Sequence, residues 1–238
     1  MLVSVVIPVL NEASQIVLTL EAARRDYGPD QVEIIVVDGG SGDGTSDLIP
    51  SDVLLLRAFP GRAGQLNYGA AAARGEVLLF CHGDSQLPFG WREALVKALS
   101  RPTVAGGVFW LNLQPARGIL QIVNHLPLLY DWRTMYGDQA QFMRRETFDQ
   151  VGGYAEIPLM EDVEMMRRLR RHGKVVRLPL RVTTSSRRFL ERGPLRQLCL
   201  VLTLVFRYLY LGASPEALAR DYRNTRRDRP GTRIVEGR

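Results

Sequence analysis

Short runs of apolar, mostly β-branched residues alternate with longer segments of helical spacing from the first residues of the chain. The apolar runs that predict strands are residues 2–8, 32–37, 53–57 and 76–81. The segments between them that predict helices are residues 11–25, 43–49 and 63–74. Because each strand is followed by one helix, the pattern predicts a mainly parallel central sheet flanked by helices.

The second half of the chain is less regular. Helices are expected over residues 91–100, 119–132 and 161–172, and Pro127 interrupts the second of them. Strands are expected over residues 104–113, 140–144, 175–178 and 181–184. No repeat or low-complexity linker divides the sequence, so we predict one α/β domain over residues 1–225 and a mobile basic tail over residues 226–238.

Residues 195–211 form a nearly continuous apolar run, interrupted only by Arg196, Gln197, Thr203 and Arg207. A membrane-spanning helix needs about 20 apolar residues, so this run is short for one. A helix that is apolar on every side is buried in the protein, in a subunit interface or at a membrane surface. We therefore expect packing in the core or in a homodimer, with peripheral membrane contact as the alternative.

The composition is that of an ordinary globular protein, with 238 residues of which 46% are hydrophobic and 24% are charged. The net charge of +6 comes almost entirely from arginine, because Lys97 and Lys174 are the only lysines. No basic stretch is interleaved with aromatic residues, so no nucleic-acid partner is expected. Cys81 and Cys199 form no disulfide framework or metal motif, and no signal-peptide pattern precedes the first strand, which favours a cytoplasmic location.

The most informative stretch is residues 33–45, in which an apolar run ends at Asp38 and enters a glycine-rich turn. A buried parallel strand that ends in a carboxylate delivers this acid to the carboxyl edge of the sheet, where open α/β sheets bind ligands. Four residues of the turn allow positive φ and close approach of backbone amides to a ligand: Gly39, Gly40, Gly42 and Gly44. Stabilisation of the turn itself is the alternative role for Asp38.

Three further motifs have polar residues at the ends of strands or helices. They are Pro8-Val9-Leu10-Asn11-Glu12, His82-Gly83-Asp84 and Glu161-Asp162. Each has a simpler structural interpretation. Asparagine caps helices well, a lone histidine is usually structural, and acids at a helix N-terminus interact favourably with the helix dipole.

In this order and spacing, the four elements resemble glycosyltransferase family 2, the inverting enzymes of the GT-A fold. The resemblance covers residues 3 to about 185. Within the family the chain is most similar to the bacterial radical SAM/selenodomain-associated transferase 2 subgroup, the arsenosugar-biosynthesis glycosyltransferase-like proteins. That similarity rests on Gly61-Arg62-Ala63-Gly64-Gln65-Leu66-Asn67, on the His82-x-Asp84 triplet and on Thr184-Ser185-Ser186-Arg187-Arg188.

The resemblance implies a Rossmann-like GT-A domain with a nucleotide-sugar half over residues 1–100, an acceptor half over residues 101–190 and C-terminal helices over residues 191–225. It also implies a role for each motif. Asp38 accepts the N3–H of uracil in a UDP-sugar, which a carboxylate is suited to do. The contacts to the base and ribose come from Pro8, Asn11 and Glu12.

By the same resemblance, Asp84 corresponds to the last acid of the family's DxD motif. It implies a divalent cation, Mn²⁺ or Mg²⁺, that is held together with the diphosphate. His82 stands at the place of the first acid, so the metal should bind weakly without the nucleotide. We expect His82 to contact ribose or phosphate, because imidazole prefers softer ions.

Arg62, Arg187 and Arg188 are suited to contact the diphosphate or the base. The pair Glu161-Asp162 matches the family's late ED motif, in which Asp162 is the catalytic base. Processive members of the family carry Q-x-x-R-W after this point, whereas residues 167–174 read Arg-Arg-Leu-Arg-Arg-His-Gly-Lys here. Transfer of a single sugar is therefore expected.

The resulting hypothesis is an inverting, metal-assisted, hexosyltransferase-like enzyme that uses a UDP-sugar and a small soluble acceptor. The alternative acceptor is a polyprenyl phosphate at the inner membrane face. Nucleotidyl transfer is disfavoured, because residues 8–12 lack the glycine-rich loop that such enzymes carry after the first strand. A catalytically inactive nucleotide-sugar-binding protein is the remaining alternative, motivated by the incomplete DxD motif.

Overall fold

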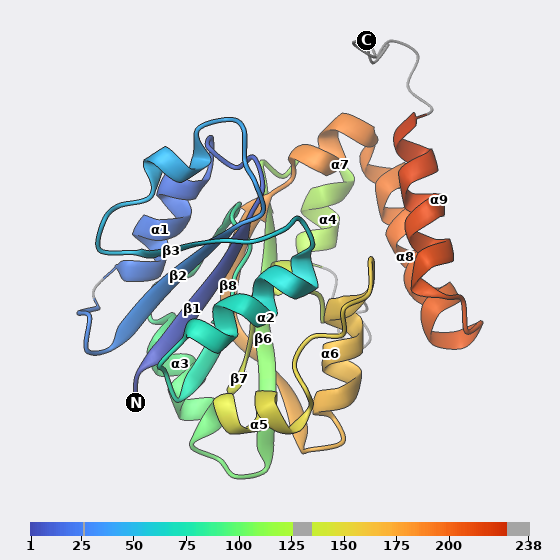
Figure 1. The fold of residues 1–238 in the computed structure, drawn as a ribbon. Helices are drawn as coiled ribbons and strands as arrows, with labels where there is room; N and C mark the ends of the chain where they lie inside the picture. The colour runs from blue at the N-terminus through green and yellow to red at the C-terminus, as the bar shows by residue number, and fades with distance from the viewer. Residues whose placement is uncertain (26, 126–134, 228–238) are drawn as a thin grey trace.

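An eight-stranded mixed sheet forms the centre of the molecule in the computed structural model, which describes residues 1–25, 27–125 and 135–227 (Figure 1). Its strand order is β3-β2-β1-β4-β7-β6-β8-β5. The first four of these strands are parallel to one another. β7 runs antiparallel to both β4 and β6, β8 is parallel to β6, and β5 is antiparallel to β8.

The first half of the chain contains the four mutually parallel strands, the short antiparallel strand β5 and the helices that connect them. The strands are β1 (Val3–Val9), β2 (Val32–Asp38), β3 (Leu54–Arg57), β4 (Val77–Phe80) and the short β5 (Ser85–Gln86). The helices are α1 (Ile16–Arg24), the 3₁₀ turn η1 (Thr45–Leu48), α2 (Arg62–Ala72) and α3 (Trp91–Leu99).

The second half completes the sheet and adds the C-terminal helices. Its strands are β6 (Val104–Gln114), β7 (Gln141–Arg144) and β8 (Lys174–Ser185). Its helical elements are α4 (Ile119–His125), the 3₁₀ turn η4 (Gly137–Gln139), α5 (Arg145–Gln150), α6 (Glu161–Leu169), α7 (Arg187–Arg192), α8 (Pro194–Tyr210) and α9 (Pro215–Arg227).

Alternate residues of the central strands enter two separate hydrophobic cores, one on each face of the sheet. In β2, Ile34 and Val36 pack on the face that α1 and α3 cover, whereas Ile35 and Val37 pack on the face that α2 covers. This period of two is what a strand buried on both faces requires. The β-branched run before Asp38 is therefore explained by burial on both sides.

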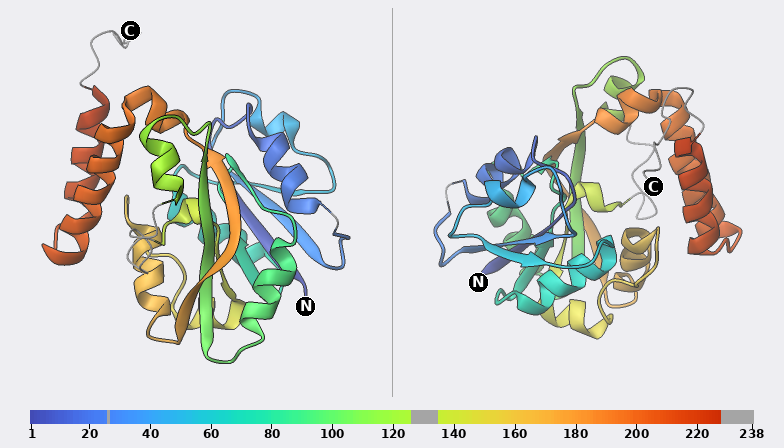
Figure 2. Two further views of the ribbon diagram at one scale, coloured as in Figure 1. Left: turned by 180° about the vertical axis from the view of Figure 1, so that it is seen from behind. Right: turned by 45° about the horizontal axis from the view of Figure 1, so that its top comes forward.

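The helix α8 packs against α6 and α9 through a third, smaller core that includes Val163, Leu204 and Leu218. Figure 2 shows α8 and α9 side by side at one end of the molecule, away from α1 and α3. The expectation that residues 195–211 pack against the protein is confirmed for the inner face of α8. No helix in the part of the chain that the structure describes is both long and apolar enough to cross a membrane.

Four sequence-based boundaries were wrong or incomplete. The first helix begins at Ile16 and not at Asn11, because Asn11 adopts a positive φ of 57°. β1 continues one residue past Pro8, to Val9. The two strands expected over residues 175–178 and 181–184 are one strand, β8, with an irregularity opposite Phe109 and Trp110 that accommodates Pro179.

The fourth of these boundaries concerns the helix expected over residues 119–132, of which the described part ends at His125. Residues 126–132 lie outside the described residues, as does the tail from residue 228 onward. The sequence analysis also missed four short elements, namely β5, η4, α5 and α7. Each is six residues or shorter, too short to show a clear periodicity. The helix α9 lies within the C-terminal helices expected over residues 191–225, except that it continues to Arg227.

The substitution Gly107→Ala tests the tight packing between β6 and β8. A Cβ atom at this position would lie 2.1 Å from the carbonyl oxygen of Val176 and 2.9 Å from the ring of Phe142. We expect Gly107→Ala to lower the free energy of unfolding by about 1–3 kcal/mol, because the backbones must separate. Urea unfolding followed by circular dichroism measures this change.

Gly64→Ala is the matched control for that substitution. A Cβ atom at Gly64 meets nothing within 4 Å, and the residue lies in the helix α2. We expect this variant to be about 0.5–1 kcal/mol more stable than the parent, from helix propensity alone. Equal effects of the two substitutions would contradict the packing described for Gly107.

Candidate functional site

The loops after β1 and β2 are locked together by hydrogen bonds between backbone amides and side chains. The Asn11 amide donates to Ser41 Oγ at 2.9 Å, and the Gly42 amide donates to Asn11 Oδ1 at 2.9 Å. The Glu12 amide donates to the buried Thr45 Oγ1 at 2.9 Å. The Asn11 side chain therefore joins two loops and does not cap a helix.

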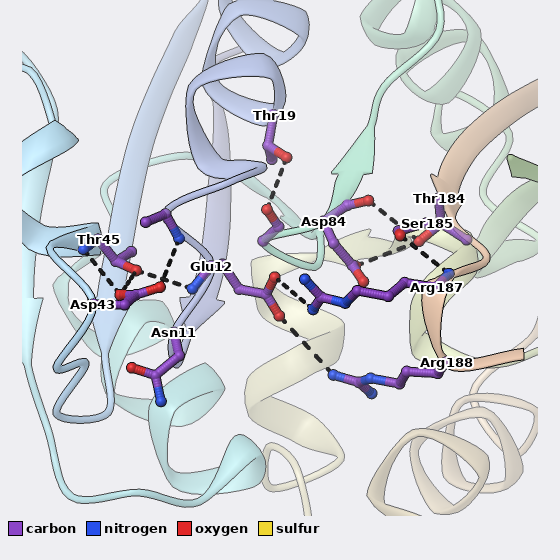
Figure 3. A network of polar contacts seen from close by, with 12 residues as sticks. Asn11, Glu12, Thr19, Asp43, Thr45, Asp84, Thr184, Ser185, Arg187 and Arg188 are labelled. Carbon is purple, nitrogen blue, oxygen red and sulfur yellow. Dashed lines mark hydrogen bonds and ion pairs between the residues drawn. The ribbon is translucent and has the colours of Figure 1, made fainter. Parts of the chain in front are cut away.

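Asp43 extends this lock, as Figure 3 shows. Its carboxylate accepts from the Ala13 amide at 3.0 Å and from the Thr45 amide at 3.1 Å. Hydrogen bonds from Thr45 and Ala13 hold the pKa of Asp43 below its ordinary value. Asp43 was not among the predicted site residues, although its place in the Gly-Asp-Gly-Thr sequence marks it as a turn residue.

Asp38 ends β2 and its carboxylate faces the turn that follows. Oδ1 accepts from the Gly40 amide at 3.1 Å, the Ser41 amide at 2.9 Å and Ser41 Oγ at 2.7 Å, and Oδ2 accepts from Ser46 Oγ. Burial alone would raise the pKa of Asp38, but the hydrogen bonds from Ser46, Ser41 and Gly40 outweigh it and lower the pKa. Asp38 is therefore an ionised acid that stabilises its own turn, with acceptor capacity left on Oδ2.

Glu12 is buried and faces two arginines from the C-terminal segment (Figure 3). Arg187 lies 3.4 Å from Glu12 Oε2 and Arg188 lies 4.0 Å from Oε1. Burial and the nearby Asp84 raise the pKa of Glu12, and the two arginines oppose that rise. The structure thus brings the predicted residues Glu12, Asp84, Arg187 and Arg188 together, from opposite ends of the chain.

Asp84 follows β4 and is half-buried beside Thr184. Among the described residues, its carboxylate Oδ1 makes long contacts, 3.5 Å to Ser85 Oγ and 3.4 Å to Thr184 Oγ1. Within residues 1–25, 27–125 and 135–227, no group of three or more His, Cys, Asp or Glu side chains is arranged to hold a metal ion. A weakly engaged carboxylate fits one ligand position of a hard cation whose other ligands come from a bound diphosphate.

His82 is half-buried in the loop between β4 and β5. Burial lowers the pKa of His82 well below its ordinary value, and the charges of Arg62 and Arg188 lower it further. The imidazole is therefore neutral and has one nitrogen to donate and one to accept. Arg62 itself is engaged, because its NH1 donates to the buried Glu161 Oε1 at 2.9 Å.

Asp162 is the second residue of α6, and it is held by the turn η4. Its Oδ2 accepts from the Gly137 amide at 2.8 Å, and its Oδ1 accepts from the Val163 amide at 2.8 Å. Gly137 passes close to the site, because a Cβ atom there would lie 2.8 Å from His82 Nε2 and 3.4 Å from Asp162 Oδ2. His82 and Asp162 therefore flank the same turn.

A chain of hydrogen bonds fixes α6 to the rest of the domain. Asn67 of α2 exchanges two hydrogen bonds with the backbone of Tyr154, at 2.9 and 2.8 Å. The Tyr154 hydroxyl donates to Gln141 Oε1 at 2.8 Å, and Gln141 Nε2 donates to the Asp162 carbonyl at 3.0 Å. The position of Asp162 thus depends on α2 and β7.

Asp138 is a residue that the sequence analysis missed. It belongs to η4, and burial raises its pKa to about 7, with the charges of Asp162 and Asp84 adding to the rise. Its only sequence signal is an acid between Gly137 and Gln139 just before β7. Pro8 lies inside β1, where it is half-buried and is paired in register with Val37 of β2.

The chain matches the family model described as Glycosyl transferase family 2 over residues 4–158. It is 28% identical over 201 residues to the probable glycosyltransferase YdaM of Bacillus subtilis, which aligns 74% of this chain with 48% of that protein. It is 25% identical over 195 residues to the beta-monoglucosyldiacylglycerol synthase of Trichormus variabilis, which aligns 70% of this chain with 41% of that protein. The chain thus spans less than half the length of these two relatives.

Two solved structures have a fold similar to that of this chain. Residues 1–349 of TarS from S. aureus, in complex with UDP-GlcNAc, superpose with a TM-score of 0.63 at 16% identity over 78% of this chain and 58% of that chain. The mannosyltransferase PcManGT of Pyrobaculum calidifontis, in complex with GDP-Man and Mn²⁺, gives a TM-score of 0.59 at 24% identity over 76% of this chain and 56% of that chain. The predicted GT-A fold, a single α/β domain with flanking helices, is confirmed, and its sheet is mixed.

Thr45→Val tests the lock between the β1 and β2 loops. The change keeps the shape of the fully buried side chain but removes the acceptor for the Glu12 amide and the donor to Asp43. We expect a loss of about 1–3 kcal/mol in the free energy of unfolding, because a buried amide loses its partner. Chemical denaturation measures it, and Thr103→Val, at an exposed threonine, is the control. Equal stability of the two variants would show that the Thr45 hydroxyl is not needed.

Proposed function

Since this chain belongs to glycosyl transferase family 2, we propose that it is an inverting glycosyltransferase that moves one sugar from a UDP-sugar to a small soluble acceptor in the cytoplasm. Within the family we propose membership of the radical SAM/selenodomain-associated transferase 2 subgroup. The observation that carries the proposal is the arrangement of three acids: Asp38 ends β2, Asp84 follows β4, and the charges of Asp84 and Asp162 both act on Asp138.

The donor site that we propose lies at the carboxyl ends of β1, β2 and β4. β1 lies between β2 and β4, so the strand order reverses there, and the edge beyond such a reversal is where open α/β sheets bind ligands. The ionised Asp38 with acceptor capacity on Oδ2 supports recognition of an imide N–H such as that of uracil. The TarS structure, whose complex holds UDP-GlcNAc, supports the same choice of nucleotide.

Asp84 is the residue that we propose to hold a divalent cation together with the diphosphate. When bound, the cation neutralises charge on the departing nucleoside diphosphate. The weak contacts of the Asp84 carboxylate support this role, because a carboxylate already satisfied by the protein has less to offer a metal. Manganese is present in the PcManGT complex.

The arginines supply the other positive charges in this proposal. Arg187 and Arg188 are paired with Glu12 across a distance of 3.4 to 4.0 Å, which is loose enough to be exchanged for a phosphate. Arg62 has a closer partner in Glu161 at 2.9 Å. We therefore assign the diphosphate to Arg187 and Arg188, and we assign to Arg62 and Glu161 the task of holding α6 beside the donor.

Asp162 is the base that we propose for the transfer step. Its carboxylate takes the proton from the acceptor hydroxyl while the acceptor oxygen forms a bond to the anomeric carbon. The bond from that carbon to the diphosphate oxygen breaks on the opposite face, and the nucleoside diphosphate leaves with the electron pair. The Gly137 amide orients Asp162 Oδ2 and leaves a lone pair on that oxygen for the proton.

A membrane-associated acceptor is the second candidate, and one observation favours it. Leu195, Leu202, Phe206 and Tyr210 lie on one face of α8 and are 39–62% exposed. An exposed apolar helix face of this kind can lie in a membrane surface. The name of the related beta-monoglucosyldiacylglycerol synthase includes a lipid, which is compatible with this candidate.

Asp162→Asn and Asp38→Asn separate transfer from nucleotide binding. We expect Asp162→Asn to lower kcat about 10²- to 10⁴-fold, because the base is lost, with UDP affinity within a factor of two or three of the parent. We expect Asp38→Asn to weaken UDP binding by about tenfold or more, because the charged acceptor is lost. UDP release from a panel of nucleotide sugars and calorimetric titration with UDP measure the two effects.

Asp149→Asn, at an exposed aspartate of α5, is the control for both substitutions. An Asp162→Asn variant that retains full transfer would exclude Asp162 as the base. A parent protein that binds UDP but neither transfers nor hydrolyses any donor of the panel would favour the inactive nucleotide-sugar-binding protein.

Asp84→Asn tests the metal. We expect the parent protein to melt at a higher temperature with UDP and Mn²⁺ together than with UDP alone, since ligands that bind the folded state stabilise it. The further rise in melting temperature that Mn²⁺ adds to that of UDP, the manganese increment, should vanish in Asp84→Asn, because one hard oxygen ligand loses its charge. Differential scanning fluorimetry measures both quantities. An increment that survives the substitution would exclude Asp84 as a ligand.

A further inference from the structure

Two side-chain polar atoms near Asp162 are shut off from solvent and have no hydrogen-bond partner among residues 1–25, 27–125 and 135–227. They are Asp138 Oδ1 and the Tyr136 hydroxyl oxygen. Native proteins leave few buried polar groups unpaired, because each costs free energy comparable to a lost hydrogen bond. Two such atoms within three residues therefore indicate a place that a ligand completes.

Both residues adjoin the turn that holds the proposed base. Gly137, which lies between them in sequence, donates its amide to Asp162 Oδ2 at 2.8 Å. The charge of Asp162 acts on both of them, and it helps to raise the pKa of the Tyr136 phenol as well as that of Asp138. The two unpaired atoms thus lie beside the carboxylate that must meet the acceptor hydroxyl.

Asp138 contributes nothing to stability that the described contacts reveal. Its carboxyl is close enough to Asp162 and Asp84 for their charges to oppose its ionisation, whereas the charge of Arg62 and a hydrogen bond from its own backbone favour it. Arg62 is already paired with Glu161. A buried acid that lies beside two other acids and has no hydrogen-bond partner for Oδ1 is typical of a functional site.

We infer that Tyr136 and Asp138 form the acceptor subsite and that this subsite takes a neutral compound with several hydroxyl groups. One hydroxyl of the acceptor donates to Asp138 Oδ1, a second accepts from the Tyr136 hydroxyl, and a third is presented to Asp162. This inference rests on the proposed function, because it assumes that Asp162 receives the proton.

The charges of this region argue against an anionic acceptor such as a polyprenyl phosphate. Asp138 and Asp162 both face the subsite, and Glu161 adjoins them. Two arginines act on this region: Arg62 is paired with Glu161, and Arg177 donates to Gln139 Oε1 at 3.3 Å and acts on Tyr136. Both are engaged with the protein, so a phosphate would meet acidic groups whose repulsion is offset only in part, whereas hydroxyl groups can donate to them.

Asp138 could instead serve the metal beside Asp84. The charge of Asp162 acts on Asp138 more strongly than that of Asp84 does. The position of Asp138 beside Asp162 and Tyr136 fits the acceptor better than the donor phosphates. The metal role is kept as an outcome of the experiment.

The test measures UDP release with three probe acceptors, namely glycerol, methyl glucoside and farnesyl phosphate, with the donor at saturation. We expect at least one neutral probe to raise UDP release above hydrolysis by water, and farnesyl phosphate not to do so. In Asp138→Asn and in Tyr136→Phe, the KM for that neutral probe should rise at least tenfold more than the KM for the donor. Asp149→Asn and Tyr68→Phe, at exposed positions, are the matched controls.

Three results would overturn the subsite. They are stimulation by farnesyl phosphate alone, no stimulation by any probe in a protein that binds UDP, and equal effects of Asp138→Asn on the donor and acceptor KM. Loss of the manganese increment in the melting temperature of Asp138→Asn would assign the residue to the metal instead. Absence of UDP binding by the parent protein would overturn the proposed function itself, and the subsite with it.

A measurement without acceptor separates this role from a purely structural one. We expect Asp138→Asn to raise the melting temperature by about 2–4 °C, because one of three mutually repelling acids is removed. A fall in the melting temperature would mean that Asp138 has a structural partner, and the subsite would then be wrong.

Discussion

The parallel pairing of β1 with both β2 and β4 is the constraint on which the rest of the structure depends. Parallel neighbours end at the same edge of a sheet, so the residues that follow all three strands must meet there. Glu12, Asp38 and Asp84 come together for this reason. Gln65 fixes that edge from below, since its Nε2 donates to backbone carbonyls near the ends of both β1 and β2, at 3.0 and 2.8 Å.

Acids gathered at one edge need positive charge, and the chain supplies it from distant segments. Arg62, at the start of α2, pairs with Glu161 at the start of α6. Arg187 and Arg188, after the last strand, reach back to Glu12 after the first. These pairs join the first half of the domain to the second across the site, so a ligand that replaces a carboxylate as the partner of an arginine changes the link between the halves.

The sequence predicted the framework well because burial on both faces leaves a clear pattern. The run Ile34 to Val37 could only be a central strand, and the acid that ends it had to lie at the sheet edge. The antiparallel placement of β7 was not predictable in this way. Its four residues carry no signal of direction, which is set by the long crossover from β6 and by pairing with β4 and β6.

Side-chain partners were harder to predict than positions. The sequence suggests that Asn11 caps a helix, but its side-chain Oδ1 accepts a hydrogen bond from the Gly42 amide in the neighbouring loop. This contact forms only when β1 and β2 are paired. Asp138 carries no motif at all. Its importance appears only when the turn η4 is placed against α6, where the carboxyl enters a region that already holds Asp84 and Asp162.

The unpaired atoms of Tyr136 and Asp138 complete the physical argument about the site. In the proposed donor site, Asp38 and Asp43 accept hydrogen bonds from the loops around them. In the proposed acceptor subsite, Asp138 Oδ1 and the Tyr136 hydroxyl lack partners within the described chain. On this proposal, the turn around Asp38 is stable before the donor binds, and the unpaired atoms form their hydrogen bonds with the acceptor. Selectivity for that molecule then follows from the cost of leaving those atoms unpaired.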